Sequence, residues 1–391
     1  MIKLVKSTFY NELETKKKLC DFLMNAEQLS MGKKCLEFES KFSEYQKRKY
    51  SVFLNSGSSA NLALIQSLLN LGKLRAGDNV GFSALTWSTN VMPLLQLNLN
   101  PVPIDVSLGN LNVCSDKLSE ILKKTKLKAL FITNLLGFCG DLDKISKICE
   151  EDGIILLEDN CESFGSELNN VRLGNFGIAS TTSFYVGHHM STIEGGLVCT
   201  DDEELYDMLL MVRAHGWDRN LSSNKKNLLR KKYKIDDFYS RYTFYVPGYN
   251  LRPTEINAVL GLEQLNYAKK INKIRNENFK LFDKAAKSNS NLRKLKLDHM
   301  SFISNFAYPV VCKNAKVFVT YKNKFESHNV EIRPIVGGSM VEQPFFMNYV
   351  KKKKLQYSCP NARKIHQFGF YVPNNPELTK EEKELICNSI K

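Results

Sequence analysis

Short apolar runs alternate with amphipathic stretches between residues 51 and 200. Four of these runs predict buried strands: residues 79–82, 103–106, 129–132 and 154–157. Residues 61–71 and 142–151 have the apolar spacing of helices. This alternation predicts an α/β domain with a largely parallel sheet. Ligands bind such sheets beyond the carboxyl ends of the strands, so functional residues are expected there.

The pattern changes after residue 200. Residues 218–246 are polar, basic and rich in tyrosine, which indicates an inserted loop. Residues 255–276 predict one long helix, and residues 306–311 and 330–332 predict strands. The expected organisation is an N-terminal segment with a large domain over residues 1–253, and a smaller C-terminal α+β domain over residues 254–391.

The composition is that of a globular protein, because 43% of the 391 residues are hydrophobic and 25% are charged. No stretch of about 18 apolar residues predicts a transmembrane helix, and no apolar signal core follows Met1. These features predict a cytoplasmic protein that does not bind membranes. The ten cysteines are scattered and form no Cys-x-x-Cys pair, so neither zinc nor a disulfide framework is expected.

The net charge of +14 comes mostly from lysine, including the run at residues 351–354. Two explanations are open: a solvated surface, or attraction of an anionic substrate such as a diphosphate sugar. Nucleic acid is not expected as a partner, because no aromatic residues interleave with the basic runs at regular spacing.

Residues 55–60 read Asn-Ser-Gly-Ser-Ser-Ala and precede the predicted helix. At Gly57 the backbone can approach an anion closely, and Ser58 and Ser59 add hydroxyl donors at a helix N-terminus. The serines can equally serve only as helix caps.

Asp159 follows the apolar run that ends at residue 157. A carboxylate there can hold a pyridine nitrogen protonated, which makes the ring an electron sink. The alternative is an N-capping aspartate. A third motif, residues 182–198, contains His188 and His189 between apolar strands. Taken alone, this pair favours structural histidines.

The order and spacing of the three motifs resemble the DegT/DnrJ/StrS family of sugar aminotransferases, which have the aspartate aminotransferase fold (fold type I). That fold has a mostly parallel mixed sheet in a large domain and a smaller C-terminal α+β domain. The resemblance covers nearly the whole chain and includes Gly77-Asp78, Thr86-Trp87, Gly137, residues 213–216 and residues 248–252. In that family the third motif carries a cofactor-binding lysine where this chain has His188, and a glycine where it has Ile193.

The missing lysine decides which chemistry is expected. Imidazole cannot form a stable covalent imine, and the chain has no lysine between Lys147 and Lys225. Pyridoxal or pyridoxamine 5'-phosphate is therefore expected to bind without a covalent link. This pattern resembles the 3-dehydratase branch of the family and implies GDP-4-keto-6-deoxymannose of the colitose pathway as substrate.

The resemblance implies that L-glutamate donates the amine and leaves as 2-oxoglutarate. Because a histidine can take up a proton near neutral pH, His188 is then expected as the acid–base group that removes the C3 hydroxyl. Ammonia and a 3,6-dideoxy-4-keto sugar are the products. The resemblance assigns cofactor contacts to Gly57, Ser58, Ser59, Trp87, Asp159, Glu162, Ser183 and Asn250, and substrate contacts to His215, Arg252 and Arg333.

Within these assignments, Asn250 implies a homodimer because it matches a residue that reaches the phosphate of the partner subunit. For His215 a structural role is equally open. No iron–sulfur cluster is expected, because no cysteine lies between Cys199 and Cys312 to bind one. The alternatives are an aminotransferase that uses another lysine and a non-catalytic, cofactor-binding regulatory protein.

Overall fold

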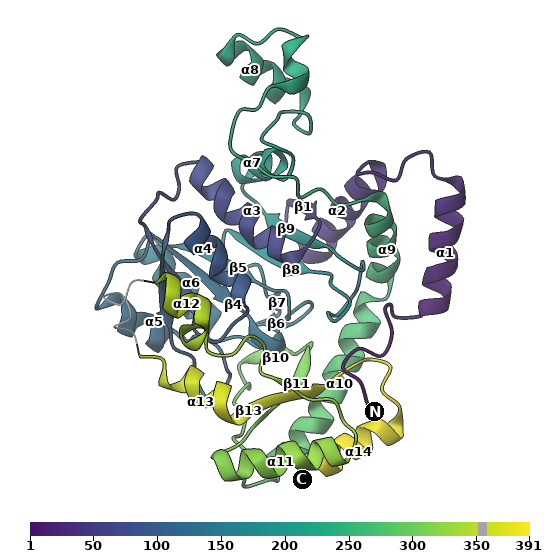
Figure 1. The fold of residues 1–391 in the computed structure, drawn as a ribbon, viewed down its shortest axis with the longest axis vertical. Coiled ribbons are helices and arrows are strands. Elements are labelled where there is room, and N and C mark those ends of the chain that lie inside the picture. The colour runs from purple at the N-terminus through teal and green to yellow at the C-terminus, as the bar shows by residue number, and fades with distance from the viewer. Residues whose placement is uncertain (351–357) are drawn as a thin grey trace.

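A seven-stranded sheet forms the centre of the protein (Figure 1). The computed structural model describes residues 1–350 and 358–391, so the lysine run at 351–354 lies outside the described residues. The strand order is β1-β9-β8-β5-β4-β2-β3. Their bounds are β1 Tyr50–Leu54, β2 Asn79–Ser83, β3 Asn100–Ile104, β4 Ala129–Thr133, β5 Ile155–Asp159, β8 Ala179–Ser183 and β9 Gly196–Thr200. In this described sheet β9 pairs antiparallel with β1 and β8 and the other pairs are parallel, which confirms the α/β class and the mostly parallel mixed sheet.

Helices between the strands bury apolar faces against this sheet. In α6 (Leu142–Glu151) the buried residues Leu142, Ile145 and Cys149 recur at intervals of three and four, so the predicted helix is confirmed. The helix predicted over residues 61–71 begins earlier, because Ser56 caps α3 (Gly57–Asn70). The other helices here are α4 Met92–Gln96, α5 Ser115–Leu122 and α7 Glu203–Arg213.

Two predicted strands were misplaced. The strand expected at 103–106 is β3, which begins at Asn100 and ends at Ile104; directly after it, the Asp105 carboxylate accepts hydrogen bonds from the backbone N–H groups of Asn361 and Ala362. The strand expected at 330–332 is wrong as well: Val330 forms only an isolated bridge with Ile2, and β12 is Arg333–Pro334.

The single long helix predicted over residues 255–276 is two helices, α9 (Glu255–Asn266) and α10 (Ala268–Lys287), separated at Tyr267. The two bury their faces in different cores. In α9, Ala258 packs with Phe38 of α2 (Lys33–Gln46), whereas in α10 Phe282 packs in the core shared with the C-terminal sheet. The break allows the chain to serve both cores.

A three-stranded sheet organises the C-terminal part, with the order β11-β13-β12. The elements are β11 Ala307–Val311, α11 Ala315–Ser327, α12 Pro344–Tyr349, α13 Pro360–Phe368, β13 Gly369–Pro373 and α14 Lys380–Ile390. The strand expected at 306–311 is confirmed as β11.

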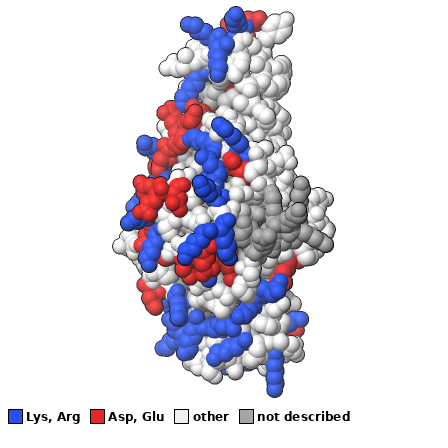
Figure 2. All heavy atoms as spheres, turned by 90° about the vertical axis from the view of Figure 1, so that its left-hand side faces the viewer, with Lys and Arg blue, Asp and Glu red and all other residues white. Residues whose placement is uncertain are grey.

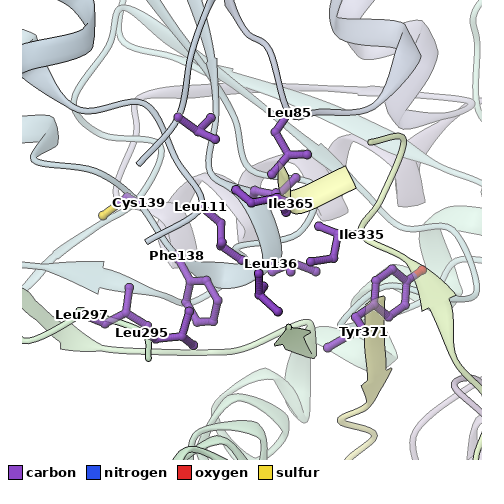
Figure 3. Close-up of a cluster of buried hydrophobic side chains, with 14 of the residues drawn as sticks. Leu85, Leu111, Leu136, Phe138, Cys139, Leu295, Leu297, Ile335, Ile365 and Tyr371 are labelled. Carbon is purple, nitrogen blue, oxygen red and sulfur yellow. The ribbon is translucent and has the colours of Figure 1, made fainter. Parts of the chain in front are cut away.

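The N-terminal and C-terminal parts of the chain share one large core. Figure 3 shows part of it, where Leu136 and Phe138 lie with Leu295, Ile335 and Tyr371. A second small sheet joins β10 (Met300–Phe302) to β6 (Glu167–Leu168) and β7 (Val171–Arg172). The division into domains after residue 253 stays a prediction.

At the N-terminus, α1 (Glu12–Asn25) and α2 (Lys33–Gln46) pack beside α9. Within the described ranges, we find no helix with the length and apolar character needed to span a membrane. The cytoplasmic location stays a prediction.

The segment 218–246 projects from the body at the top of Figure 1. It contains α8 (Ser223–Tyr233) and a short 3-10 turn at Tyr239–Tyr242, and a bridge between Trp217 and Phe244 closes its base. The expected loop therefore has helical structure of its own. No residue of α8 is buried, and at the base of the segment Leu221 packs in the core beside α3 and α7, with Leu229, Tyr245 and Val246 partly buried against it.

Candidate active site

A cavity of about 470 Å³ opens at the carboxyl ends of the parallel strands. Thr133, Asp159 and Ser183, which are the last residues of β4, β5 and β8, all line it. This is where an α/β sheet places its ligands, as the sequence pattern predicted.

Asp159 is a buried carboxylate whose direction is fixed by three N–H donors. Its Oδ2 accepts hydrogen bonds from Asn61 Nδ2 at 3.1 Å and Asn90 Nδ2 at 2.7 Å, and its Oδ1 accepts one from the Cys161 backbone at 2.9 Å. No described helix begins at Asp159, so the N-capping alternative is wrong. The carboxylate can pair with a ring nitrogen that carries a proton.

The N-terminus of α3 forms a second polar feature of the cavity. Gly57 lies against β8 so closely that a Cβ there would be 2.6 Å from the Ser183 Cβ. Ser56 accepts a hydrogen bond from the Ser59 N–H at 3.0 Å and so caps the helix, and Ser58 lines the cavity. The serine motif therefore provides both a helix cap and a cradle in which partial positive charge favours an anion.

His188 lies in the loop between β8 and β9, with its ring centroid 5.3 Å from that of Phe306. Its Nδ1 is buried and has no hydrogen-bond partner among the described residues. Burial lowers the pKa of His188 to about 4; the Asp159 charge opposes this shift and the Arg275 charge adds to it. The imidazole is therefore neutral at neutral pH, with a nitrogen free to accept a proton.

Glu162 faces the same cavity and accepts a hydrogen bond from the Leu136 backbone at 2.8 Å. Burial raises the pKa of Glu162 to about 8, because desolvation outweighs that hydrogen bond and the Asp159 charge acts in the same direction as burial. At neutral pH this side chain is mostly a carboxylic acid, which can donate a hydrogen bond into the cavity.

The sequence model of the DegT/DnrJ/EryC1/StrS aminotransferase family matches residues 11–391. The chain belongs to this family. It is 34% identical over 373 residues to GDP-4-keto-6-deoxy-D-mannose 3-dehydratase of Yersinia pseudotuberculosis, covering 94% of this chain and 93% of that one.

Solved structures of this family agree with the fold. The H188N mutant of GDP-4-keto-6-deoxymannose-3-dehydratase with bound GDP-perosamine has a TM-score of 0.88 and 30% identity, and each chain is covered completely. The same enzyme with a trapped PLP-glutamate geminal diamine has a TM-score of 0.86 and 31% identity, again over all of both chains.

Most of the family positions predicted from sequence meet in the one cavity. The predicted residues that line it are Gly57, Ser58, Trp87, Asp159, Glu162, Ser183, His188 and Arg333. Those that do not are Ser59, His215, Asn250 and Arg252. Ser59 belongs to the first turn of α3, where its hydroxyl accepts a hydrogen bond from Ser56 at 2.9 Å. Arg333 reaches the rim and forms an ion pair with Glu331 at 2.8 Å.

The other three outlying residues lie together near the base of the projecting segment. Asn250 accepts a hydrogen bond from Arg252 Nε at 2.9 Å, and the His215 ring packs against Trp217 at 5.1 Å. Within one chain they do not reach the cavity. The role of Asn250 was predicted for the partner subunit and stays a prediction, as do the substrate contacts of His215 and Arg252.

At the position of the family's first glycine, Ile193 has a φ of 72°. This left-handed conformation is unfavourable for a β-branched residue. The Ile193 N–H donates to Ser191 Oγ at 2.9 Å, while Asn257 donates to the carbonyls of Thr192 and Glu194 on either side. These bonds hold the loop that carries His188 in its turn although the glycine is absent.

Sequence analysis missed Arg275, a buried cation on α10. Its Nη1 donates to the carbonyls of Phe306 at 2.7 Å and Asn374 at 2.6 Å, and no described carboxylate pairs with it. Burial lowers the pKa of Arg275 to about 9. Arg275 thus fixes the Phe306 backbone beside the His188 ring. The sequence around residue 275 does not indicate this contact, because the partners of Arg275 are distant in the sequence.

His189 is a structural residue by its contacts. Its Nε2 lies 2.9 Å from the Ser304 carbonyl oxygen, and its ring is buried against Phe164 and Phe306. Of the two adjacent histidines, only His188 lines the cavity beside Asp159.

Proposed function

We propose that this protein is a sugar-nucleotide 3-dehydratase that uses pyridoxal and pyridoxamine 5'-phosphate without a covalent link. Its substrate is GDP-4-keto-6-deoxy-D-mannose, its amine donor is L-glutamate, and its products are a 3,6-dideoxy-4-keto sugar and ammonia. One observation carries the proposal: a neutral histidine with a free nitrogen lies beside Asp159, where the family has its lysine. Relatives that are similar in sequence and in structure have the name of this activity.

The cavity fits the cofactor at three points. Asp159 suits a protonated pyridine nitrogen, the N-terminus of α3 with Gly57 and Ser183 suits the phosphate, and Trp87 at the rim suits stacking on the ring. None of the described residues that line the cavity is a lysine. When bound, the cofactor supplies an electron sink joined to C4 of the sugar.

In this proposal His188 moves the proton. Because its ring is neutral, its free nitrogen could take up a proton beside the cofactor when the cofactor is bound. The protonated ring is then disfavoured by burial and by Arg275, so it readily returns the proton to the C3 hydroxyl as that group leaves. Asp159 offsets part of this penalty, which makes the brief protonation of His188 possible.

Glu162 is proposed to assist as a hydrogen-bond donor beside the cofactor ring, since its carboxyl group is mostly protonated at neutral pH. Arg333, at the rim, is proposed to contact the substrate, and the exposed half of its side chain remains available despite the pair with Glu331. The proposed site thus has an acid, Glu162, a base, His188, and a cation, Arg333, in separate positions.

The working unit is proposed to be a homodimer. Large apolar side chains are exposed around the cavity mouth, among them Trp87 at 53%, Tyr185 at 50% and Ile193 at 45%. Such a surface is typical of an interface. A partner subunit on this face can bring its Asn250 and Arg252 to the cavity that they do not reach within their own chain.

A substrate panel tests the function. The protein, saturated with cofactor and glutamate, is incubated with GDP-, CDP-, UDP- and dTDP-linked 4-keto-6-deoxy sugars, and products are identified by mass spectrometry. The expected result is a dideoxy keto sugar with release of ammonia from the GDP sugar. An amino sugar as main product supports the aminotransferase alternative, and no glutamate-driven change in cofactor absorbance supports a non-catalytic protein.

A further inference from the structure

A second cavity, of about 640 Å³, lies apart from the catalytic one and shares no lining residue with it. On one side are residues 107–109 and the start of α5; on the other are residues 290–296, Lys313 and Asn361. The cavity therefore lies between segments that follow the large sheet's β3 and segments of the C-terminal part. Figure 2 shows Lys and Arg side chains gathered toward the lower end of one face of the molecule.

The charge of this second cavity is strongly positive. Its charged lining residues are Lys117, Arg293, Lys294, Lys296, Lys313 and a single acid, Asp116. Lys117 pairs with Glu120 at 2.7 Å, but in the described ranges no ion pair involves the other four cations. The Nε of Arg293 is buried and also lacks a hydrogen-bond acceptor among the described residues. A buried donor without a partner is costly, so an acceptor is expected there.

Main-chain hydrogen bonds fix the backbone at three of these residues. The Arg293 N–H donates to the Val311 carbonyl at 2.8 Å, and the Lys313 N–H donates to the Asn291 carbonyl at 3.1 Å. The Lys296 N–H donates to the Gly109 carbonyl at 2.8 Å, which joins the two sides of the cavity. The backbone around the cavity is thus part of the packed structure, and the four unpaired cations line the same cavity.

We propose that this cavity binds a small anion through a diphosphate group. Lys and Arg provide the charge that phosphate oxygens require, and the hydroxyl groups of Ser107 and Ser290 add donors. None of its lining residues is aromatic, so no surface for stacking a nucleobase is present and the phosphates are the recognised part. The volume is in the usual range for small-molecule sites.

Binding has a structural consequence. Arg293, Lys294, Lys296 and Lys313 line the cavity without a carboxylate partner in the described structure, so their like charges repel one another, while Ser107 and Lys117 face them from the other side. An anion between them removes this repulsion and holds the two sides together. Occupancy of the cavity is therefore expected to stabilise the folded protein.

Calorimetric titration of the cofactor-loaded protein with inorganic pyrophosphate, at constant ionic strength, tests the proposal. The variant K296Q/K313Q removes two exposed cations of the cavity. The matched control K269Q/K280Q removes two exposed lysines of α10 that form no ion pair in the described structure. We expect one saturable binding event that is weakened at least tenfold in K296Q/K313Q and unchanged in K269Q/K280Q.

The outcomes are distinguishable. Equal weakening in both variants, or no saturable binding to the parent protein, overturns the proposal. Binding of GDP that K296Q/K313Q weakens as it weakens binding of pyrophosphate supports the proposal and identifies a nucleotide as a source of the diphosphate. Binding of a sulfated polysaccharide without pyrophosphate overturns it. Dehydration of the sugar substrate at saturation is expected to be unchanged in K296Q/K313Q, so this test is independent of the proposed function.

Discussion

Replacing Glu162 with glutamine is expected to change how the stability of the protein depends on pH. Folding raises the pKa of this carboxyl group from 4.5 to about 8, mainly through burial. Because the folded state holds the proton more tightly, the stabilisation is complete below the unfolded pKa and is lost as the pH rises through the folded value. Glutamine resembles the protonated acid and does not titrate.

The size of the effect follows from the two pKa values. Between pH 5.5 and 7.5 the unfolded carboxyl group is almost fully ionised and the folded one mostly protonated, so stability falls by about 2.5 kcal/mol. With an unfolding entropy of about 2.1 cal/mol/K per residue, this corresponds to about 3 °C in Tm. Other titrating groups, His188 included, contribute equally to both proteins and cancel in the comparison.

The assay is thermal unfolding of cofactor-free parent protein and Glu162→Gln at pH 5.5 and 7.5. Between pH 5.5 and pH 7.5 the Tm of the parent is expected to fall by about 3 °C more than the Tm of the variant. Glu150→Gln, an exposed change on α6, serves as the control and is expected to follow the parent. If the parent and Glu162→Gln lost stability in parallel over this range, the carboxyl group would not be protonated and its proposed donor role would be wrong.

The site and the sequence support four further predictions. Borohydride is expected to leave the cofactor extractable from the parent protein, because no lysine lines the described cavity; a reduced phosphopyridoxyl-lysine in peptide mapping would contradict this. His188→Lys is expected to restore covalent trapping and favour aminotransfer. Arg275→Met leaves the Phe306 and Asn374 carbonyls without their donor, so its free energy of unfolding, measured by chemical denaturation, is expected to fall by about 2–6 kcal/mol. Arg275→Lys is expected to lose less. Equal stability of Arg275→Met and the parent would refute the conclusion that Arg275 fixes the Phe306 backbone. Analysis for iron and sulfide is expected to find neither in stoichiometric amount, since no cysteine lies between Cys199 and Cys312.

The sheet and half of the site were accessible from sequence because they depend on local patterns. Buried strands of a parallel sheet are continuous apolar runs, and functional residues directly follow them, as Asp159 and Ser183 do. The family resemblance then related His188 to the missing lysine. Each of these signals lies within a few residues of the chain.

Contacts between distant segments were not accessible in this way. Asn61 and Asn90 orient Asp159, but the sequence around each asparagine does not indicate that Asp159 is its partner. The Asp105 carboxylate, directly after β3, binds the backbone of residues 361–362, more than 250 residues away. The division of residues 255–276 into two helices likewise reflects two separate cores, which the helical period cannot distinguish.

Dehydration by His188→Asn tests the central claim most directly. Parent and variant are loaded with cofactor, supplied with glutamate and GDP-4-keto-6-deoxy-D-mannose, and followed by mass spectrometry of the sugar. The account predicts a 3,6-dideoxy-4-keto sugar and ammonia from the parent and no dehydrated product from the variant. The variant should still bind the cofactor, as measured by absorbance, because Asp159 and the N-terminus of α3 are unchanged. Dehydration by the variant at the parent rate would contradict the account, since another group would then have to move the proton.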